Sequence, residues 1–597
     1  MGQIVYVQVL LPLKLEWTPW YSTEEELRVG QRVEVIFARK SHIGVVVRIC
    51  DHPEIDPAKV ERIQSADTGL PDISENELRL WEFVSGYYLC TPGEVLKAAY
   101  PNSKLRGERI GVLIDRKAAQ SRARMEAALQ RKVDTLSQRL LAKEEQLQSR
   151  KSSGKRAKAE VTERLQSERD SLASQLDNAR AALASFLTDK GSAGGAAQAS
   201  PSAAVGGAAE RSLRADPFPG GAERYPAPGG KPLLIRGANR MQEYFRHCEA
   251  CLAAGRDVLV LEPESELGLN IENEFSRRFC ASPADGKLLI YNAQTSPAQK
   301  RRIASQLRGA HEPVIVLGQR SAIFLPYSSL GLIIVDEEQD SSYKQTEPAP
   351  RYNGRDLAAV LASISGAGFI LGSNCPSLET LLNALSGKYA LMDLPEAHPA
   401  KVEIIDINDE RRKNGMVGDF SRKAIEAVNK TAPDALITIV RCFRSEEQTA
   451  EQLHGLFPGR DPQILTAYAA RKSPVISDLT IIMQADALFD RDDFRADEKV
   501  LQLLTMLKSR TRELIVQTGA GRHPVFAALA GTSCEDALLA ERKQFSLPPF
   551  TRIVDVHDLR SGQVIERVML PRDRNLAGAK EELRSRYRGV WFDVDPL

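Results

Sequence analysis

Three carboxylates stand together near the middle of the chain, directly after a short apolar run. Leu332–Val335 is followed by Asp336, Glu337 and Glu338. In enzymes that hydrolyse nucleotides, a buried strand of this kind ends in acids that hold a magnesium ion and orient an attacking water. The pattern is therefore typical of a Walker B strand. The simpler alternative is a structural one, because apolar runs often end in acids where a strand meets a loop.

A nucleotide site of this type also needs a phosphate-binding loop. Such a loop requires glycines that let backbone N–H groups surround the phosphates, a lysine for their charge, and a Ser or Thr for magnesium. It should follow the apolar run Leu233–Ile235, where the chain reads Arg236-Gly-Ala-Asn-Arg240-Met-Gln-Glu243. This segment contains no lysine and lacks the glycine-rich turn, although Arg236 or Arg240 can supply positive charge.

The elements that would position these residues follow an α/β pattern. Apolar runs begin at residues 233, 258, 288, 314, 332 and 369, and again at 402, 435, 479 and 514, with amphipathic stretches between them. Parallel sheets with crossover helices have this appearance. We therefore expect an α/β fold with two tandem lobes, 231–398 and 399–519, and a small α+β C-terminal domain over 520–597.

The first 112 residues predict a separate β-rich domain. Residues 4–11, 31–37 and 42–49 alternate as strands do, and the last two pair naturally as a hairpin. Ser74 and Glu77 form a capping-box signature at the start of a helix.

Residues 115–190 contain no proline and carry apolar residues at three/four spacing, broken by Ser152-Ser-Gly154. The pattern predicts a helical coiled-coil hairpin; one continuous helix is the alternative. Its basic residues alternate with Glu, which favours a solvated face over a DNA surface. Residues 191–230 are rich in Gly, Ala, Ser and Pro and predict a flexible linker.

Composition excludes few functions. The chain has 597 residues, with 80 Lys+Arg against 79 Asp+Glu, so no overall basic field indicates nucleic acid. Of eight cysteines, only Cys248 and Cys251 have the spacing of metal ligands, and no second pair completes a zinc site. We expect no metal, reduced thiols and a cytoplasmic protein. No run approaches the roughly 18–20 apolar residues of a membrane span, and no signal peptide is expected.

Several strings, in order along the chain, resemble the PriA family of bacterial replication restart. They are Tyr87–Ala99, Val316–Pro326, Val335–Gln345, Pro350–Ala358, Leu371–Thr380, Asp493–Thr505 and Ala540–Phe550. The resemblance covers most of the chain outside 115–230. It implies an N-terminal domain that binds the 3′ end of a DNA strand, followed by two RecA-like lobes of a superfamily-two, ATP-dependent 3′-to-5′ DNA helicase.

The chain departs from the family pattern where ATP chemistry would occur. In an ungapped match Met241, Gln242 and Glu243 occupy the Gly-Lys-Thr positions of the phosphate loop. Arg510 remains from the arginine-finger motif, whose glycines and last arginine are lost. The family's two zinc sites are absent, and Gln339 replaces the usual final His of motif II. Asp336 and Glu337 then become residual acids that serve as helix caps or hydrogen-bond partners, and no cofactor is expected.

The resemblance also selects residues that can contact DNA. They are Trp17, Trp20, Tyr21, Arg32, Arg39, Lys40 and Arg320. Aromatic rings beside basic groups can stack a terminal base and hold its phosphate. In the alternative interpretation the aromatic residues pack the edge of a small sheet.

The leading hypothesis is a PriA-like DNA-binding protein of replication restart and primosome assembly without ATPase or unwinding activity. It would bind forked or 3′-ended DNA at single-/double-strand junctions, with primosome or single-strand-binding proteins as partners, in the nucleoid. One alternative is an active helicase that uses ATP and Mg²⁺ through a noncanonical phosphate loop. The other is a protein–protein adaptor that uses the coiled hairpin.

Overall fold

The computed structural model describes residues 4–101 and 230–596, without 265, 281–286, 396–398, 443–444, 474, 490–492 and 573–575, and the single positions 130, 137, 140 and 169. One compact unit comprises Met1–Gly107, Glu223–Thr295 and Gln299–Leu597, and a second comprises Glu108–Ala222 and Ser296–Ala298. The predicted hairpin at 115–190 and linker at 191–230 lie almost wholly outside the described residues. Both stay predictions.

The N-terminal part is a five-stranded sheet with two helices. Its strands are β1 (Val5–Leu10), β2 (Trp20–Thr23), β3 (Arg32–Phe37), β4 (Lys40–Cys50) and β5 (Glu61–Arg62), in the order β3-β4-β1-β2-β5. The predicted hairpin is confirmed, since β3 and β4 pair antiparallel across Ala38 and Arg39, both with positive φ. The single-turn η1 (Pro57–Lys59) precedes β5. Helix α1 (Glu75–Tyr87) begins at the predicted capping box, and α2 (Pro92–Ala99) follows.

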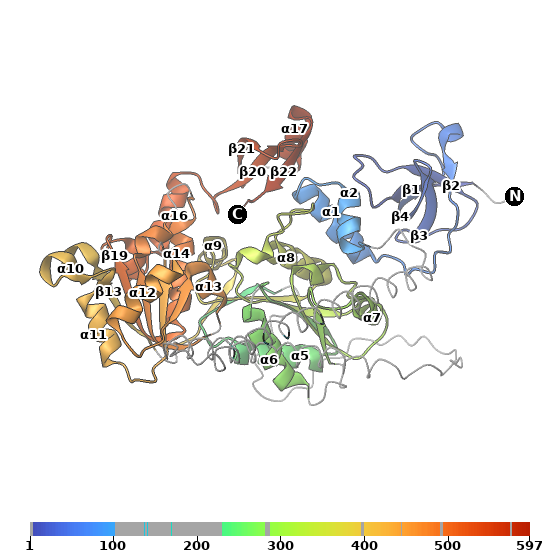
Figure 1. Cartoon of the computed structure of the whole chain (residues 1–597). Coiled ribbons are helices and arrows are strands. Elements are labelled where there is room, and N and C mark those ends of the chain that lie inside the picture. The colour runs from blue at the N-terminus through green and yellow to red at the C-terminus, as the bar shows by residue number, and fades with distance from the viewer. Residues whose placement is uncertain are drawn as a thin grey trace, which may run out of the picture. The chain divides into compact units, whose positions relative to one another are not determined.

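The first lobe is a seven-stranded, wholly parallel sheet, drawn in green to yellow in Figure 1. Its strands are β6 (Leu233–Arg236), β7 (Asp257–Leu261), β8 (Leu288–Tyr291), β9 (Ile315–Gly318), β10 (Leu330–Val335), β11 (Gly368–Ser373) and β12 (Ala390–Asp393), in the order β12-β6-β11-β10-β7-β9-β8. The helices are α5 (Met241–Ala253), α6 (Glu266–Phe279), α7 (Pro297–Arg308), α8 (Gly354–Ser365) and α9 (Leu378–Leu385), with short turns η2 (Arg320–Phe324) and η3 (Ser341–Tyr343). Helices α5 and α6 cover one face of the sheet, and α7 and α8 cover the other.

The second lobe, in yellow to orange, is a five-stranded parallel sheet in the order β13-β19-β18-β16-β17. Its strands are β13 (Lys401–Asp406), β16 (Ile437–Arg441), β17 (Gln463–Thr466), β18 (Ser477–Met483) and β19 (Thr511–Thr518), beside a small hairpin of β14 (Met416–Val417) and β15 (Phe420–Ser421). Helices α11 (Arg422–Lys430) and α12 (Glu446–Leu456) pack on one face, and α13 (Ala467–Lys472) and α14 (Ala496–Lys508) on the other. Two shorter elements are α10 (Ile407–Lys413) and η4 (Ala485–Leu488). The two lobes are RecA-like, as the fold-class prediction states.

Helices α15 (Pro524–Leu529) and α16 (Glu535–Gln544) follow the expected lobe boundary at residue 519, yet their apolar residues pack into the same core as α14. The remaining C-terminal residues form an antiparallel sheet in the order β21-β20-β22. It consists of β20 (Thr551–Asp558), β21 (Val564–Pro571) and β22 (Val590–Val594), with helix α17 (Leu576–Arg586). Among the described residues, no helix is both long enough and apolar enough to cross a membrane.

The N-terminal helices, one face of the first lobe and the C-terminal sheet share one hydrophobic core. Polar contacts reinforce it at Lys344, whose ammonium is buried. This ammonium donates to the carbonyls of Arg351 (2.8 Å) and Val594 (2.7 Å) and pairs with Asp593 (2.7 Å). Lys344 therefore joins the segment that follows Asp336–Glu338 to strand β22.

Candidate functional site

The carboxyl ends of three neighbouring strands form the candidate site. Strand β11 pairs in parallel with β6 on one side and β10 on the other, so the segments that follow them meet at one edge of the sheet. Gly237–Arg240 connects β6 to α5, at the place expected for a phosphate loop. Asp336 and Glu337 follow β10, and Asn374 follows β11. The predicted loop and the predicted acids are therefore brought together.

Arg240 fills the space between these segments with its own guanidinium. Its Nη2 lies 2.9 Å from Asp336 Oδ1 and 2.6 Å from Glu337 Oε1, while Nε donates to the same Asp336 oxygen at 3.0 Å. Nη1 donates to Gly237 O (2.5 Å) and Asn374 Oδ1 (2.7 Å). Arg240 is only 4% exposed and Asp336 only 3%. One buried cation thus ties together the ends of all three strands.

A tyrosine and a glycine complete this arrangement. Tyr244, one turn further along α5, donates its hydroxyl to Asp336 Oδ1 at 2.7 Å. A Cβ at Gly372 of β11 would lie 1.6 Å from the Tyr244 hydroxyl oxygen and 3.0 Å from Cδ of Arg240. Only a glycine at this position leaves room for both side chains.

Glu337 is held from its other side by Gln339. The Gln339 amide donates to Glu337 Oε2 at 2.6 Å and accepts from the Ser373 hydroxyl at 2.6 Å. Glu337 itself has φ +46, a left-handed conformation that non-glycine residues rarely adopt. Its backbone is therefore strained where its carboxylate meets Arg240. Both acids are hydrogen-bond partners within the lobe, and neither acts as a helix cap.

The charges of the cluster are set by burial and by the single cation. Burial alone would lower the pKa of Arg240, but Asp336 and Glu337 outweigh it and raise that pKa well above its ordinary value. Burial raises the pKa of Asp336 against the opposing effect of Arg240. Burial also acts to raise the pKa of Glu337, but Arg240 and the Gln339 amide outweigh it and lower the pKa. The pKa values of the two acids therefore shift in opposite directions.

ATP and magnesium, which the fold class implies, do not fit the residues present. The guanidinium of Arg240 occupies the carboxylate oxygens that would face a metal ion. Met241, Gln242 and Glu243 form the first turn of α5, so a carboxylate stands where a phosphate would need positive charge. Among the described residues, no group of three or more His, Cys, Asp or Glu side chains is placed to hold a metal ion.

Arg510, the predicted remnant of the arginine finger, faces this cluster from the second lobe. Burial lowers the pKa of Arg510, and the negative charge of Glu337 acts in the opposite direction. Its Nη1 donates to the Ser473 carbonyl at 2.8 Å. Asn374 links the lobes directly, because its amide donates to Ser509 Oγ at 3.2 Å.

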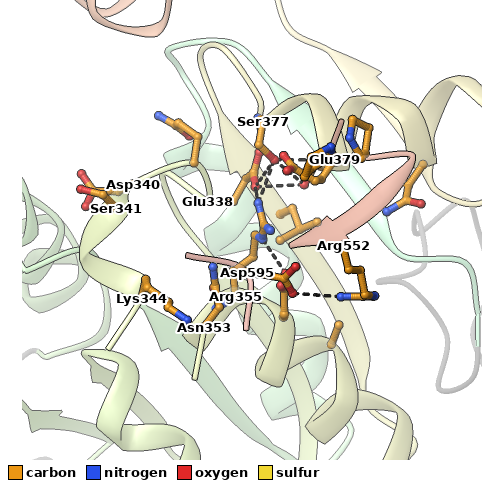
Figure 2. Close-up of a pocket in the computed structure, with 18 of the residues that line it drawn as sticks. Glu338, Asp340, Ser341, Lys344, Asn353, Arg355, Ser377, Glu379, Arg552 and Asp595 are labelled. Atoms are coloured by element: carbon orange, nitrogen blue, oxygen red, sulfur yellow. Dashed lines mark hydrogen bonds and ion pairs between the residues drawn. The ribbon is translucent and has the colours of Figure 1, made fainter. Parts of the chain in front are cut away.

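The third acid of the motif, Glu338, belongs to a different network at the edge of a cavity of about 360 Å³ (Figure 2). It accepts from Ser377 N (2.6 Å), the Ser377 and Thr380 hydroxyls (3.0 and 2.9 Å) and Arg355 Nη1 (3.0 Å). Figure 2 shows Arg552 and Asp595 of the C-terminal part in the same cavity, paired at 2.9 Å. Glu338 therefore has a structural role, which is to fix the start of α9.

The predicted DNA-contacting residues divide into exposed and buried groups. Trp17 is 59% exposed and lies against Phe37, and Arg39 and Lys40 are exposed at the turn between β3 and β4. Trp20 and Tyr21 are instead buried in β2, as the packing alternative expects. The remaining two are engaged within the protein.

Arg32 is 5% exposed, with its guanidinium 4.2 Å from the centre of the Tyr100 ring, because β3 turns it towards the helices. Arg320 pairs with Glu264 at 2.8 Å and donates to the Ser342 carbonyl at 2.6 Å. The surface that the predicted set leaves available therefore consists of Trp17, Arg39 and Lys40.

Sequence reasoning did not find Tyr244, Asn374 and Gln339 as members of the ion-pair cluster. A signal for Tyr244 was present, since it stands four residues after Arg240 and therefore on the same helix face. The contact of Asn374 with Arg240 spans 134 residues of sequence. The spacing of the sequence carries no information about such a contact.

Comparisons with known proteins agree with the family resemblance. A family model, the PriA 3′DNA-binding domain (3′BD), matches residues 8–101. The replication restart protein PriA of Chlamydia pneumoniae is 36% identical over 198 residues, which are 32% of this chain and 26% of the relative. That of Rickettsia prowazekii (strain Madrid E) is 37% identical over 221 residues, which are 35% of this chain and 33% of the relative. The aligned stretch thus spans a third or less of these relatives.

Among solved structures, RecG bound to a three-way DNA junction is similar with a TM-score of 0.36 and 13% identity. The similarity covers 53% of this chain and 44% of RecG.

We predict that Arg240→Met lowers the free energy of unfolding by about 3–5 kcal/mol, because it leaves two buried carboxylates without a cation. Chemical denaturation at neutral pH measures this. Adding Asp336→Asn and Glu337→Gln in the same chain should recover most of the loss. The control Arg246→Met removes an exposed arginine of the same helix (54% exposed) and should change stability by less than about 0.5 kcal/mol. Equal effects of Arg240→Met and the control would contradict the ion-pair account.

A second prediction concerns Glu262, which follows β7. Burial, and then the neighbouring Glu272, raise the pKa of Glu262 from 4.5 to about 9. Since the folded state keeps a proton that the unfolded chain releases, this contribution to stability is fully present below pH 4.5 and is lost as pH rises to about 9. Glu262→Gln should therefore flatten the pH dependence of the unfolding free energy across that window. The exposed Glu274→Gln should leave it unchanged, and an unaltered slope in Glu262→Gln would exclude the buried neutral acid.

Proposed function

We propose that this chain, which resembles PriA over part of its length, is a DNA-binding protein of replication restart that acts without hydrolysing ATP. The observation that carries the proposal is the ion pair of buried Arg240 with Asp336 and Glu337. A guanidinium in this place neutralises the acids that a metal ion would need. The lobes then serve as a rigid scaffold, since Arg240 replaces the changing contacts of a nucleotide with permanent ones.

DNA binding is assigned to the N-terminal sheet. The match over residues 8–101 and the exposed Trp17 support it. Trp17 offers a ring face on which a terminal base can stack, and Arg39 and Lys40 are close in sequence to its neighbour Phe37. The preferred substrate is forked or 3′-ended DNA at a single-/double-strand junction. Primosome and single-strand-binding proteins are the partners proposed with it.

The ATP part of the proposal is tested by measuring hydrolysis with and without forked DNA. We expect the rate of the full chain to equal that of its Glu337→Gln variant in both conditions, because no metal-held water is available to attack. Equilibrium titration with a fluorescent ATP analogue should likewise show no saturable binding. DNA-stimulated hydrolysis that Glu337→Gln abolishes would overturn the proposal and identify an active helicase with a noncanonical phosphate loop.

The DNA part predicts that Trp17→Ala weakens binding of a 3′-ended strand about 5- to 100-fold, which is the loss of about 1–3 kcal/mol of base stacking. Fluorescence anisotropy at fixed salt measures the affinity. Ile55→Ala is the control, because Ile55 is an exposed apolar residue (44%) in the same part of the chain. The logarithm of the wild-type binding constant should also fall linearly with the logarithm of the salt concentration. Absence of binding at low salt would favour the protein–protein adaptor instead.

A further inference from the structure

A second cavity, of about 370 Å³, lies where the N-terminal helices, the segment after motif II and the C-terminal sheet meet. We call it the Trp591 cavity, after the residue of β22 on its wall. Its lining includes Cys90 and Thr91 before α2, Arg351, Arg584, and the stretch from Tyr587 to Phe592. These parts share one hydrophobic core, so the walls are held in fixed relation. The volume is in the range of about 300–1,000 Å³ that is typical of ligand sites.

Positive charge dominates the lining of the Trp591 cavity. Lys14, Arg351, Arg584 and Arg588 line it, against only two carboxylates, Glu16 and Glu94. One of these two is committed elsewhere, because Glu94 Oε2 accepts from the Thr91 backbone and hydroxyl, both at 2.9 Å, in the capping box of α2. The chemistry of the cavity is therefore that of an anion site.

Arg351 is the most rigid of these cations. Its guanidinium lies 3.6 Å from the centre of the Trp591 ring. The His557 ring stacks on the Trp591 ring, with the two ring centres 3.8 Å apart and the ring planes inclined by only 5°. The Arg351 side chain is 11% exposed, and its Nη2 pairs with the exposed Glu347 at 2.5 Å. Its Nε is buried and has no hydrogen-bond partner among the described residues. A planar guanidinium that is fixed by stacking suits a phosphate group.

The Trp591 cavity adjoins the predicted DNA surface through one loop. Lys14 and Glu16 of this loop line the Trp591 cavity. Other residues of the same loop, which runs from Leu13 to Pro19, line a smaller cavity of about 60 Å³ next to Trp17, and Glu16 lines both cavities. A strand whose end is held at Trp17 can therefore extend from the small cavity towards the cations of the Trp591 cavity. This continuity favours a nucleic acid strand over an acidic protein segment, for which nothing connects the cavity to a second anchor.

We propose that the Trp591 cavity binds phosphodiester groups of the same single strand whose end the N-terminal sheet holds. The inference rests on the proposed DNA-binding function and extends it to a second contact, made by the C-terminal part of the chain. Trp17 would engage the terminal base, and the arginines would engage the backbone without reading its sequence.

The test uses the full chain and removes two exposed arginines, Arg584→Gln with Arg588→Gln. Binding of single strands of about 12 nucleotides is measured by anisotropy over a range of salt concentrations. A plot of log affinity against log salt concentration has a negative slope. Loss of two phosphate contacts should make this slope shallower by about 1.4. The ratio of the affinities for strands with a free 3′ end and with a 3′-phosphorylated end should be the same as in the wild type. Arg586→Gln is the matched control, since Arg586 is 60% exposed on the same helix and does not line the cavity.

Three results would overturn the inference. An unchanged slope in the double variant, with wild-type binding intact, would exclude the cavity while leaving the proposed function standing. An equal loss in Arg586→Gln would show a general field instead of a site. A short Asp/Glu-rich peptide provides the third result. If the double variant weakens binding of this peptide but leaves strand binding unchanged, the cavity belongs to a protein partner. Absence of DNA binding by the wild-type chain would remove the proposed function itself, a result that is distinguishable from the other three.

Discussion

The buried guanidinium of Arg240 is the interaction on which the first lobe depends. It contacts the loop after β6 through Gly237, the end of β10 through Asp336 and Glu337, and the loop after β11 through Asn374. Burying three charged groups is costly, so such a cluster persists only when every donor and acceptor is matched. Here the Tyr244 hydroxyl and the Gln339 amide supply the remaining bonds. The geometry is specific, and a removed partner cannot be replaced by water.

The same cluster explains how the first lobe is held together at the place expected for a nucleotide. In a working motor the acids after β10 are stabilised by ligands that come and go. In this chain the guanidinium of Arg240 provides the positive charge permanently. Asn374, which binds Arg240, also donates a hydrogen bond to Ser509 of the second lobe. A second tie runs through Glu498, which accepts from Leu378 N and from Arg542, each at 3.0 Å. Polar contacts therefore join the lobes, beside the apolar packing of Leu378 and Leu381 against the second lobe.

The sequence predicts the buried part of this fold well because central parallel strands are nearly continuous apolar runs. Two strands that it does not reveal, β12 and β17, lie at sheet edges. Strand β12 has mostly exposed residues, and β17 is only half-buried, so neither shows a strong apolar signal. The capping box at Ser74 is predicted because all of its partners lie within three residues.

The candidate site is only partly readable from the sequence, for a related reason. The missing lysine and glycines at Met241–Glu243 are visible locally. The role of Arg240 is not visible locally, because its partner Asp336 lies 96 residues further along the chain. Burial is equally hidden. Trp20 and Arg32 have the chemistry of DNA contacts, and only the course of β2 and β3 shows that they face the interior.

The contacts of Lys344 have a consequence for the order in which the chain folds. Its ammonium is buried, and one of its acceptors, the carbonyl of Val594, lies 250 residues further along. During synthesis the segment after motif II therefore emerges long before the strand that completes its surroundings. Contacts of such high sequence separation form slowly and leave apolar surface open meanwhile. The surroundings of Lys344 in the first lobe are therefore complete only after β22 has joined them.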